Sequence, residues 1–419
     1  MSEYNHFSHF SGLLAATVCF LFTQAAAQES APPLGVDDGR QLPWDSGANP
    51  NPALANVPLG GEDCEEDDGP SLLIEPRAHL RTVVGATDLD DAGLAHGGHD
   101  PIHNGFSIPS LSLGADILYG EHLAGFTEGI ISWNEEDGWN TELEEFYAKF
   151  MNLPGGFEVK AGRLLAAVGT RNNIHNHAWK FVDANLGNVR FLGEDGLVIE
   201  GVEVAWTVPT RWDDQLTLSF GDAVTHDHEE EEPAMGGGHT HSEEAEEALW
   251  DKNIFSARYQ ATFWPRDTSN FIYGASYIQG KNFMGRTGRL YGLDLTYTWL
   301  QDEDHGKQLL WRNEAMMRRI NTDEGKFNEF AISSSAIYKF NPEWEVGLRY
   351  DYLEGVEDPE LPERHRISPS LTHYFSLGKI ESMARLQYNY DHADERDDAH
   401  SIWLQFGFEW GAGGDAHVH

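Results

Sequence analysis

The chain has 419 residues, and 69 acidic residues against 28 basic ones give it a formal net charge of −41 with histidine neutral. Such a charge excludes a nucleic-acid backbone as the natural partner, because neutralising phosphates requires basic surface. Aromatic residues make up 12% of the chain, whereas acidic chains that remain disordered are poor in aromatic residues. We therefore expect most of the chain to fold.

The N-terminal region predicts export from the cytoplasm. An apolar run over Leu13–Phe22 is followed by Ala25–Ala27, which is the pattern of a secretory signal peptide covering residues 1–27. Residues 28–71 are rich in proline, glycine and acid, and such a stretch cannot bury enough apolar surface to offset its ordering entropy. We expect a flexible acidic leader in the periplasm.

The exported chain has few cysteines and no long apolar segment. Of the two cysteines, Cys19 lies in the expected signal peptide, so only Cys64 remains. A single thiol excludes an intramolecular disulfide and a cysteine zinc site. After residue 27 no apolar stretch approaches 18 residues, which excludes a membrane-spanning helix. Any membrane that the protein crosses must be crossed by strands.

From about residue 72 onward the dominant pattern is an alternation of apolar and polar residues. In Trp344–Tyr352 the apolar residues alternate with Glu, Gly, Arg and Asp, and Tyr291–Trp299 and Ala384–Asp391 repeat the pattern. A period of two predicts strands with one apolar and one polar face. A soluble β-sandwich, as in a two-domain soluble β protein, and an outer-membrane barrel both show this alternation.

Several features favour the barrel. The polar faces carry charges of both signs, and the segment Ile402–Trp410 resembles the C-terminal strand by which outer-membrane barrels are recognised by the insertion machinery. Short connections alternate with mostly longer ones, as expected for periplasmic turns and outer loops. Aromatic residues stand at the expected strand ends, as in the interfacial girdles of barrels: Trp133, Trp206, Trp264, Trp299, Trp344, Tyr352, Tyr390 and Trp410.

The fold class predicted is therefore all-β, a transmembrane antiparallel barrel of about 16 strands over residues 72–410. The first strands are expected at Leu72–Val84, Ser107–Leu118 and Leu123–Trp133. Residues 411–419, which contain His417 and His419, form a tail in the periplasm.

One region resembles a known family of channels. The segment Leu153–Arg163 resembles the turn and strand of barrels in the style of the phosphate-selective porins, and Gly169–Asp183 is similar to histidine-bearing loops of a group of Gram-negative outer-membrane proteins. The resemblance covers residues 72–410 and is most specific over 141–208. It implies an outer-membrane channel of about 16 strands. Phosphate channels line their path with lysine and arginine, whereas this chain is acidic, so the resemblance does not extend to phosphate as the solute.

A histidine- and acid-rich segment, Thr225–Asp251, predicts metal binding. Two His-x-His pairs flank the glycines of 236–238, with ten acidic residues around them. Imidazole binds zinc, copper or nickel, and carboxylates raise the local concentration of cations. The alternative is a solvated acidic loop with incidental histidines. The candidate ligands are His226, His228, His239 and His241.

Two further outer loops carry histidines, namely His96, His99 and His103 in the first and His175 and His177 in the third. If the strand count holds, three histidine-bearing loops share the outer mouth. For His175 and His177 there is a second interpretation, because Trp179, Phe181 and Asp183 suggest a loop folded into the lumen as a constriction, with the histidines in structural hydrogen bonds.

Charged residues on the polar faces are candidates for the channel lining, either as a selectivity filter or as structural ion pairs between strands. They are Lys160, Arg163, Glu203, Arg258, Asp294, Arg312, Glu314, Arg318, Arg349 and Arg385. The net field of the chain attracts cations.

The sequence therefore predicts an outer-membrane channel for passive uptake of small cationic solutes, with zinc or another divalent transition metal captured at its mouth. No cofactor is required, and Zn²⁺ is expected only as the bound solute. The alternatives are a general porin for small organic solutes and a surface protein that binds metal or adheres without transport. Outer-membrane lipid and the barrel-insertion machinery are the expected partners, with a homotrimer left open. Enzymatic motifs such as H-E-x-x-H and G-x-S-x-G are absent, so we expect no enzyme.

Overall fold

The computed structural model describes residues 71–88, 96–101, 104–135, 138–210, 212–224, 250–301, 306–321, 326–355, 362–394 and 396–411. The expected signal peptide, the acidic leader with Cys64, most of Thr225–Asp251 and the tail beyond residue 411 lie outside these ranges. Among the described residues, no helix is long and apolar enough to cross a membrane.

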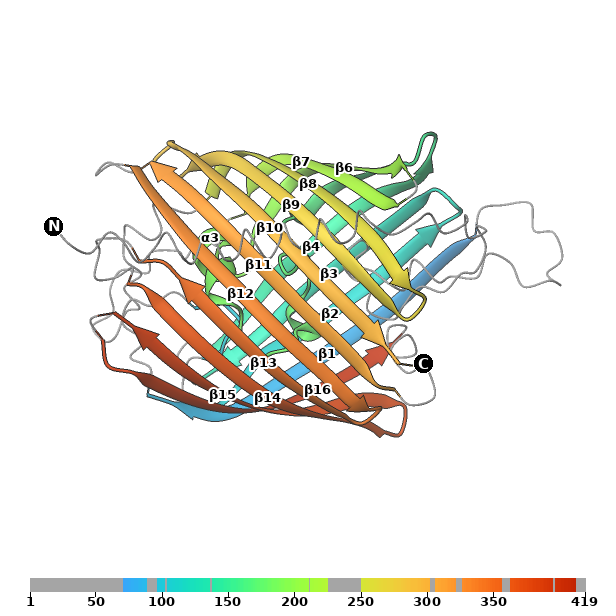
Figure 1. Cartoon of the computed structure of the whole chain (residues 1–419). Coiled ribbons are helices and arrows are strands. Elements are labelled where there is room, and N and C mark those ends of the chain that lie inside the picture. The colour runs from blue at the N-terminus through green and yellow to red at the C-terminus, as the bar shows by residue number, and fades with distance from the viewer. Residues whose placement is uncertain are drawn as a thin grey trace. The chain divides into compact units, whose positions relative to one another are not determined.

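Sixteen antiparallel strands form one closed barrel, in which each strand pairs with its neighbours in the chain and β1 pairs with β16 (Figure 1). The strands are β1 Leu72–Thr87, β2 Gly105–Tyr119, β3 Leu123–Asn134, β4 Gly138–Leu153, β5 Phe157–Leu165, β6 Val198–Pro209, β7 Asp213–Ala223, β8 Trp250–Arg266, β9 Ser269–Asn282, β10 Thr287–Leu300, β11 Gln308–Asn321, β12 Lys326–Asn341, β13 Trp344–Leu353, β14 Arg364–Leu377, β15 Ile380–Ala393 and β16 Ala399–Gly411. The predicted fold class and strand number are confirmed.

The two faces of each strand differ as the alternation predicts. In β13, Leu348 is 54% exposed, whereas its neighbour Arg349 is completely buried. In β10, Leu293 is 66% exposed and the adjacent Asp294 is buried. Because the sheet closes on itself, the exposed apolar side chains lie on the outer surface and the buried polar ones point into the lumen. An apolar outside and a charged inside are typical of a barrel in a lipid bilayer.

The connections differ in length between the two ends of the barrel. The chain turns within residues 120–122, 154–156, 210–212 and 342–343 at one end, and the longest connections, 88–104, 166–197 and 224–249, lie at the other. Gly155 and Gly156 adopt positive φ values of 87° and 80° in one of the tight turns, a conformation in which glycine avoids the steric cost of a side chain. This alternation agrees with periplasmic turns at one end and outer loops at the other.

Candidate functional site in the barrel lumen

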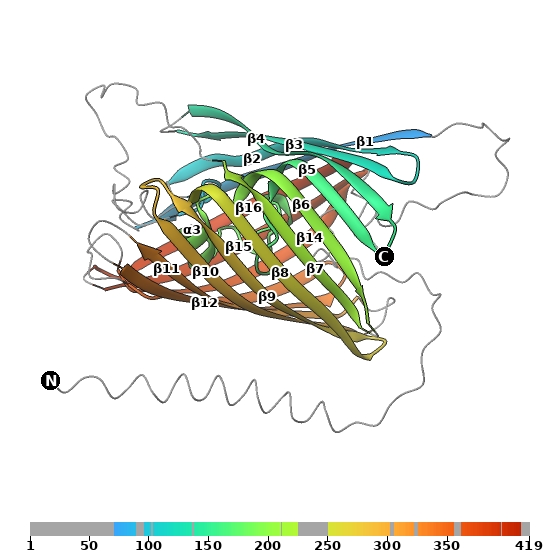
Figure 2. The same ribbon diagram turned by 90° about the horizontal axis from the view of Figure 1, so that it is seen from above.

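Residues 166–197, which connect β5 to β6, fold into the barrel; we call this segment the constriction loop. It contains a short 3₁₀ turn, η1 (Asn176–Ala178), and one helix, α3 (Leu186–Leu192). Both ribbon views show α3 within the ring of strands (Figures 1 and 2). The expectation that Trp179, Phe181 and Asp183 belong to an inward-folded loop agrees with this arrangement.

Asn172 ties the two ends of the constriction loop together. Its Nδ2 donates to the carbonyls of Ala166 and Leu197 at 2.7 and 3.2 Å, and its Oδ1 accepts from the Leu197 amide at 2.7 Å. All these groups are buried, where an unmade hydrogen bond is costly. The 32-residue excursion from 166 to 197 therefore leaves and rejoins the barrel at one point.

The helix α3 is held inside by apolar packing. Asn185 caps its first turn by accepting from the Asn188 amide at 2.7 Å, and Gly193 ends it with a φ of 108°. Phe191 and Leu192 of α3 join a buried cluster with apolar residues that replace polar ones on the inner face of β8–β12. These inward residues are Trp250, Ile254, Ile278, Leu290, Met316 and Ala331. Burial of this apolar surface draws the helix onto the barrel wall.

Asp183 anchors the loop to β13, β14 and β15. Its carboxylate accepts from Arg349 at 2.8 Å and from Arg366 at 2.7 Å, and also from Gln387 at 2.6 Å and Asn389 at 2.9 Å. Burial alone would raise the pKa of Asp183, but the two guanidinium groups outweigh burial and hold this pKa below its usual value. The carboxylate therefore stays ionised and keeps all four partners.

A second buried anchor lies at the C-terminal part of α3. Arg190 pairs with Glu329 of β12 at 2.6 Å, and Arg318 of β11 pairs with the same carboxylate at 2.5 Å. Arg318 also donates to the Arg190 carbonyl at 2.8 Å. Two cations thus share one carboxylate, and the main chain of the loop is bonded directly to the wall.

The N-terminal part of the loop reaches β3 and β4, on the other side of the barrel. Imidazole Nε2 of His175 lies 2.9 Å from Glu145, and Nδ1 lies 2.9 Å from Glu144. His177 lies 3.4 Å from Glu128 and stacks on His79 of β1 with ring centroids 3.9 Å apart. In the closed order, β4 and β12 are eight strands apart among 16. The constriction loop therefore spans the lumen between opposite walls.

A register shift explains how two adjacent glutamates face the lumen. Glu128 pairs with Glu145, but the next residue of β3, Gly129, pairs with Leu143. The extra residue, Glu144, forms a β-bulge, which re-aims side chains. Glu144 and Glu145 are consequently both buried, whereas simple alternation would expose one of them.

The two histidines of the loop have opposite protonation tendencies. Burial by itself would lower the pKa of His175, but the charges of Glu128 and Glu144 outweigh burial and raise this pKa well above its usual range. For His177, burial and the neighbouring His79 lower the pKa to about 4. At neutral pH we therefore expect His175 to carry a proton among the carboxylates and His177 to be neutral.

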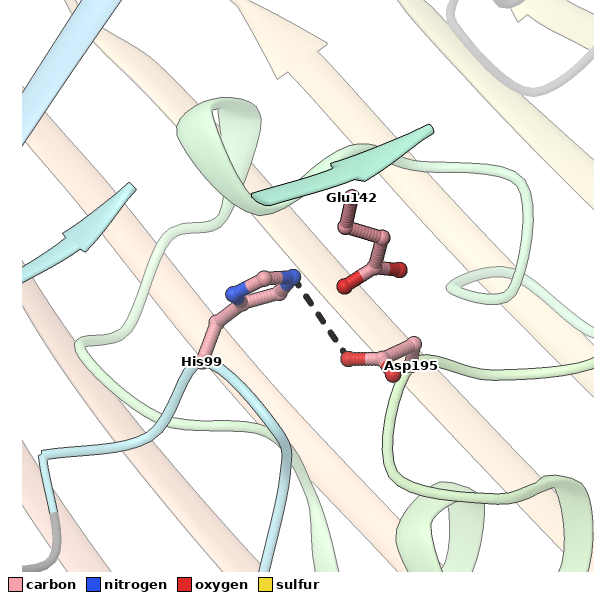
Figure 3. A group of neighbouring side chains, drawn as sticks. All are labelled: His99, Glu142 and Asp195. Carbon is pink, nitrogen blue, oxygen red and sulfur yellow. Dashed lines mark ion pairs between the residues drawn. The ribbon is translucent and has the colours of Figure 1, made fainter. Parts of the chain in front are cut away.

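A separate cluster lies nearer to the end with long loops, where the first outer loop docks on the constriction loop. Figure 3 shows His99, Glu142 and Asp195 pointing toward one another, and one ligand atom from each lies within 4.8 Å of the others. His99 Nε2 is 3.5 Å from Asp195, and Nδ1 is 3.1 Å from the Pro109 carbonyl. Asp100 fixes the docking by accepting from the Ala184 amide at 2.8 Å.

The predicted metal-binding histidines are distributed unevenly. His99, His175 and His177 lie in the clusters above, whereas His96 is half-buried with Nδ1 3.2 Å from the Gly97 carbonyl. The other candidates lie outside the described residues, namely His103, His226, His228, His239 and His241.

The predicted lining residues other than Arg163 point inward, and most of these take part in ion pairs or hydrogen bonds. Lys160 pairs with Glu203 at 3.1 Å and Arg258 with Asp294 at 2.6 Å. Arg318 and Arg349 hold the constriction loop, Arg385 donates to the Trp179 carbonyl at 2.9 Å, and Glu314 accepts from the Thr170 amide at 3.2 Å. Arg312 is half-buried on the inner face. The wall charges therefore position the loop as well as line the lumen.

The prediction of Arg163 as a lining residue is wrong, because Arg163 pairs in register with the exposed Phe146 and Glu200 while its neighbour Leu164 is buried in the lumen. Arg163 therefore belongs to the outward face of β5.

Several residues that shape the site were not predicted. Glu128, Glu144, Glu145 and His79 belong to strands whose patterns differ little from those of the other strands, so only the adjacent pair at 144–145 offered a clue. Asp183 was predicted as part of an inward loop, but its partners on three strands were not.

The fold and the site together define a class. A closed barrel of 16 antiparallel strands, with an apolar outer face and a loop folded into its charged lumen, is a porin-like outer-membrane β-barrel. Proteins of this class lie in the outer membrane of Gram-negative bacteria.

Solved structures with the same architecture support this assignment. An anion-selective porin from Comamonas acidovorans matches with a TM-score of 0.54 and 11% identity over 81% of this chain and 100% of that one. The outer-membrane channel DcaP of Acinetobacter baumannii gives 0.51 and 10% over 83% and 99%. The trimer form of the outer-membrane protein OmpT from Vibrio cholerae gives 0.51 and 12% over 81% and 100%. At such low identity the likeness concerns the fold.

Sequence comparison adds one relative. An uncharacterised protein from Aquifex aeolicus is 27% identical in an alignment of 307 residues that covers 66% of this chain and 63% of that protein. The chain thus matches less than two thirds of the length of this relative. No family model matches the chain.

Proposed function

We propose that the protein is a passive outer-membrane channel in which the constriction loop narrows the lumen and selects the solutes that pass. The observation that carries the proposal is the loop itself, bonded to β3–β4 at one side and to β12–β15 at the other. A loop fixed across a closed barrel leaves passages whose size and charge are set by the side chains of the loop and of the facing wall.

The solute class that we propose is small cations, with divalent transition metals such as zinc as the preferred members. The cluster of His99, Glu142 and Asp195 lies near the end with long loops and offers imidazole and carboxylate ligands (Figure 3). The net charge of −41 attracts cations before they reach the lumen. The segment 226–241 carries four more histidines that can act as metal ligands, and we propose that they capture metal at the mouth.

A general porin for small organic solutes is the second candidate. Arg171, Arg312 and Lys180 line the same cavity as His99 and Glu144. A passage that has positively charged side chains on one side and carboxylates on the other suits zwitterionic or anionic organic molecules.

Planar bilayers and liposomes distinguish these functions. Purified, folded protein is expected to conduct with cation preference in potassium chloride, and liposomes that contain it are expected to admit zinc to a trapped zinc-sensitive dye. Protein-free liposomes are the control. Swelling with sugars or amino acids but no zinc entry would favour the general porin, and the absence of any conductance would reject the channel.

A further inference from the structure

We propose that Glu128, Glu144 and His175 bind one divalent transition-metal ion inside the lumen and that this ion links the constriction loop to the barrel wall. The site is distinct from the outer cluster of His99, Glu142 and Asp195. It also goes beyond the proposed transport function, because a metal at this site would fix the loop whether or not the channel conducts.

The ligand atoms already converge. One ligand atom from each of the three residues lies within 4.8 Å of the others, and all three residues are buried. Nδ1 of His175 is 2.9 Å from Oε2 of Glu144 and 3.5 Å from Oε1 of Glu128. The ion pair between Nδ1 of His175 and Glu144 holds only while His175 is protonated, and the three buried atoms make no other hydrogen bond. Polar atoms in such a state are costly unless a further group satisfies them.

The orientation of His175 is suited to a metal ligand. Its Nε2 lies 2.9 Å from Oε2 of Glu145, and Oε1 of Glu145 accepts from the Leu165 amide at 2.7 Å. When a metal ion displaces the proton from Nδ1, the proton kept on Nε2 is donated to Glu145 and the lone pair of Nδ1 is directed at Glu128 and Glu144. Histidine ligands of metals characteristically donate their other N–H to a carboxylate in this way.

The charges around the site favour a cation. Glu128, Glu144 and Glu145 bring three carboxylates together in a buried region. Arg77 lies 3.3 Å from Oε2 of Glu128 and is shared with Asp116 at 3.2 Å. Arg81 and Lys160 act on Glu144 and Glu145 through their charge, and Lys160 is itself paired with Glu203. Around these groups, His79 and His177 add imidazoles but no negative charge. The excess of negative charge is offset by a divalent ion more fully than by one proton on His175.

The ligand types select the metal. One imidazole nitrogen and two carboxylate oxygens suit zinc and neighbouring transition metals, whereas calcium and magnesium prefer oxygen ligands alone. His177 is placed to add a second nitrogen, because its Nδ1 is 3.4 Å from Oε1 of Glu128. Three protein ligands leave a fourth position open for water.

The test uses the full-length protein, folded in detergent and washed with chelator. Zinc alone is added and its stoichiometry is measured by equilibrium dialysis, and cobalt is added separately to record the visible absorption of a tetrahedral site. H175Q and E144Q are each expected to lose one zinc equivalent and the cobalt band. H122Q, which changes a histidine in the turn after β2, is expected to keep both. Retention of both signals by H175Q and E144Q would overturn the proposal.

Two further measurements exclude a merely structural effect. E145Q removes no ligand but loosens His175, so zinc affinity is expected to fall about 10–100-fold. Zinc is also expected to slow proteolysis within 166–197 in the native protein and not in E144Q; equal cleavage rates would reject the link between loop and wall. Conductance recorded on the same preparations keeps the two proposals separate. Zinc binding without conductance contradicts only the channel. Conductance with no zinc equivalent that H175Q removes contradicts only this site.

Discussion

At the scale of single residues, the carboxylate of Asp183 makes four hydrogen bonds from the constriction loop to the barrel wall. It accepts hydrogen bonds from Arg349, Arg366, Gln387 and Asn389. Each arginine has a second carboxylate partner, Asp351 for Arg349 and Asp391 for Arg366. Removing Asp183 therefore releases the loop without leaving either guanidinium group unpaired.

We expect D183N to lower the free energy of unfolding by about 1–3 kcal/mol, the usual cost of losing charged hydrogen bonds in a buried site. Because the loop is then held less firmly, single-channel current should become larger and noisier. Denaturant unfolding and bilayer recordings measure the two effects. D398N, which changes an exposed pair with His392, should alter stability by less than about 0.5 kcal/mol; equal effects of the two variants would contradict the anchoring role.

The pH dependence of this anchor follows from the direction of its pKa. The pKa of Asp183 is lower in the folded protein than its usual value, because Arg349 and Arg366 outweigh the effect of burial. Its stabilising contribution is therefore fully present above the usual pKa of about 3.9 and is lost as the pH falls through the lower, folded-state pKa. The stability difference between the native protein and D183N should stay constant from pH 7 to about pH 4 and shrink below it.

The chemistry of the residues at this scale was predictable from the sequence, but their contacts were not. His175 and His177 were predicted as metal ligands because two imidazoles close together in the sequence suit metal binding. The carboxylates that face them come from β4, about 30 residues earlier in the chain, and from β3, almost 50 residues earlier. Alternation indicates which side chains point inward, but it does not indicate which of the many inward charges meets a given loop.

At the scale of elements, the base of the constriction loop depends on Asn172. Its three hydrogen bonds close residues 166–197 against the barrel. An alanine there leaves buried main-chain groups with fewer partners, at a cost of about 1–3 kcal/mol.

We expect N172A to speed amide hydrogen exchange throughout 166–197 while exchange in the strands stays slow, because local opening becomes easier without global unfolding. Exchange followed by mass spectrometry resolves the two regions. N328A is the matched control, since Asn328 is an exposed partner of Arg319. Unchanged exchange in N172A would show that the helix packing alone holds the loop.

The segment between β7 and β8 that can be deleted without changing a strand is shorter than the histidine- and acid-rich segment Thr225–Asp251, because β8 begins at Trp250. Trp250 and Asp251 belong to β8, and Trp250 donates to the Phe191 carbonyl at 2.8 Å. Removing 225–249 and inserting a short glycine linker therefore preserves the packing of α3. We expect this deletion to lower the zinc stoichiometry of the native protein, as measured by dialysis, while the cobalt band of the lumen site persists. An unchanged zinc stoichiometry would remove the metal role from this connection.

The β-bulge at Glu144 marks the limit of what a period of two reveals. In the sequence, Leu143 and Glu144 follow the alternation of apolar and polar residues, and Glu145 adds a second acidic residue. A regular strand would place only one of the two glutamates in the lumen. The paired register with β3 breaks the period, and this register depends on the whole sheet. Strand positions were therefore predictable, whereas the direction of this side chain was not.

At the scale of the whole molecule, the acidic charge should govern selectivity. With a net charge of −41, the permeability ratio of potassium to chloride should exceed one at low salt. It should fall as the salt rises from 0.1 to 1 M, because the Debye length shortens from about 10 to 3 Å. Reversal potentials across salt gradients measure the ratio. A ratio that does not change with salt would locate the selectivity in the buried pairs of the lumen.

The overall architecture was the part most accessible to prediction. Strands expected at Leu72–Val84, Ser107–Leu118 and Leu123–Trp133 correspond to β1, β2 and β3 with small shifts at their ends. Because the alternation recurs in strand after strand, an error in the predicted end of one strand does not change the predicted number of strands. The loop inside the barrel depends on apolar inner residues such as Ile254 and Leu290, which break the polar face locally and have no regular spacing.

The pairing of β1 with β16 has a consequence for biogenesis. Thr87 meets Ser401 across this seam, 314 residues apart in the chain. A contact between such distant segments forms slowly, because the intervening chain must first be ordered. Until β16 arrives, the barrel is an open sheet whose two free edges expose main-chain donors and acceptors. A chain truncated before residue 399 should therefore fail to close and be left to aggregation or proteolysis, however well its other 15 strands are formed.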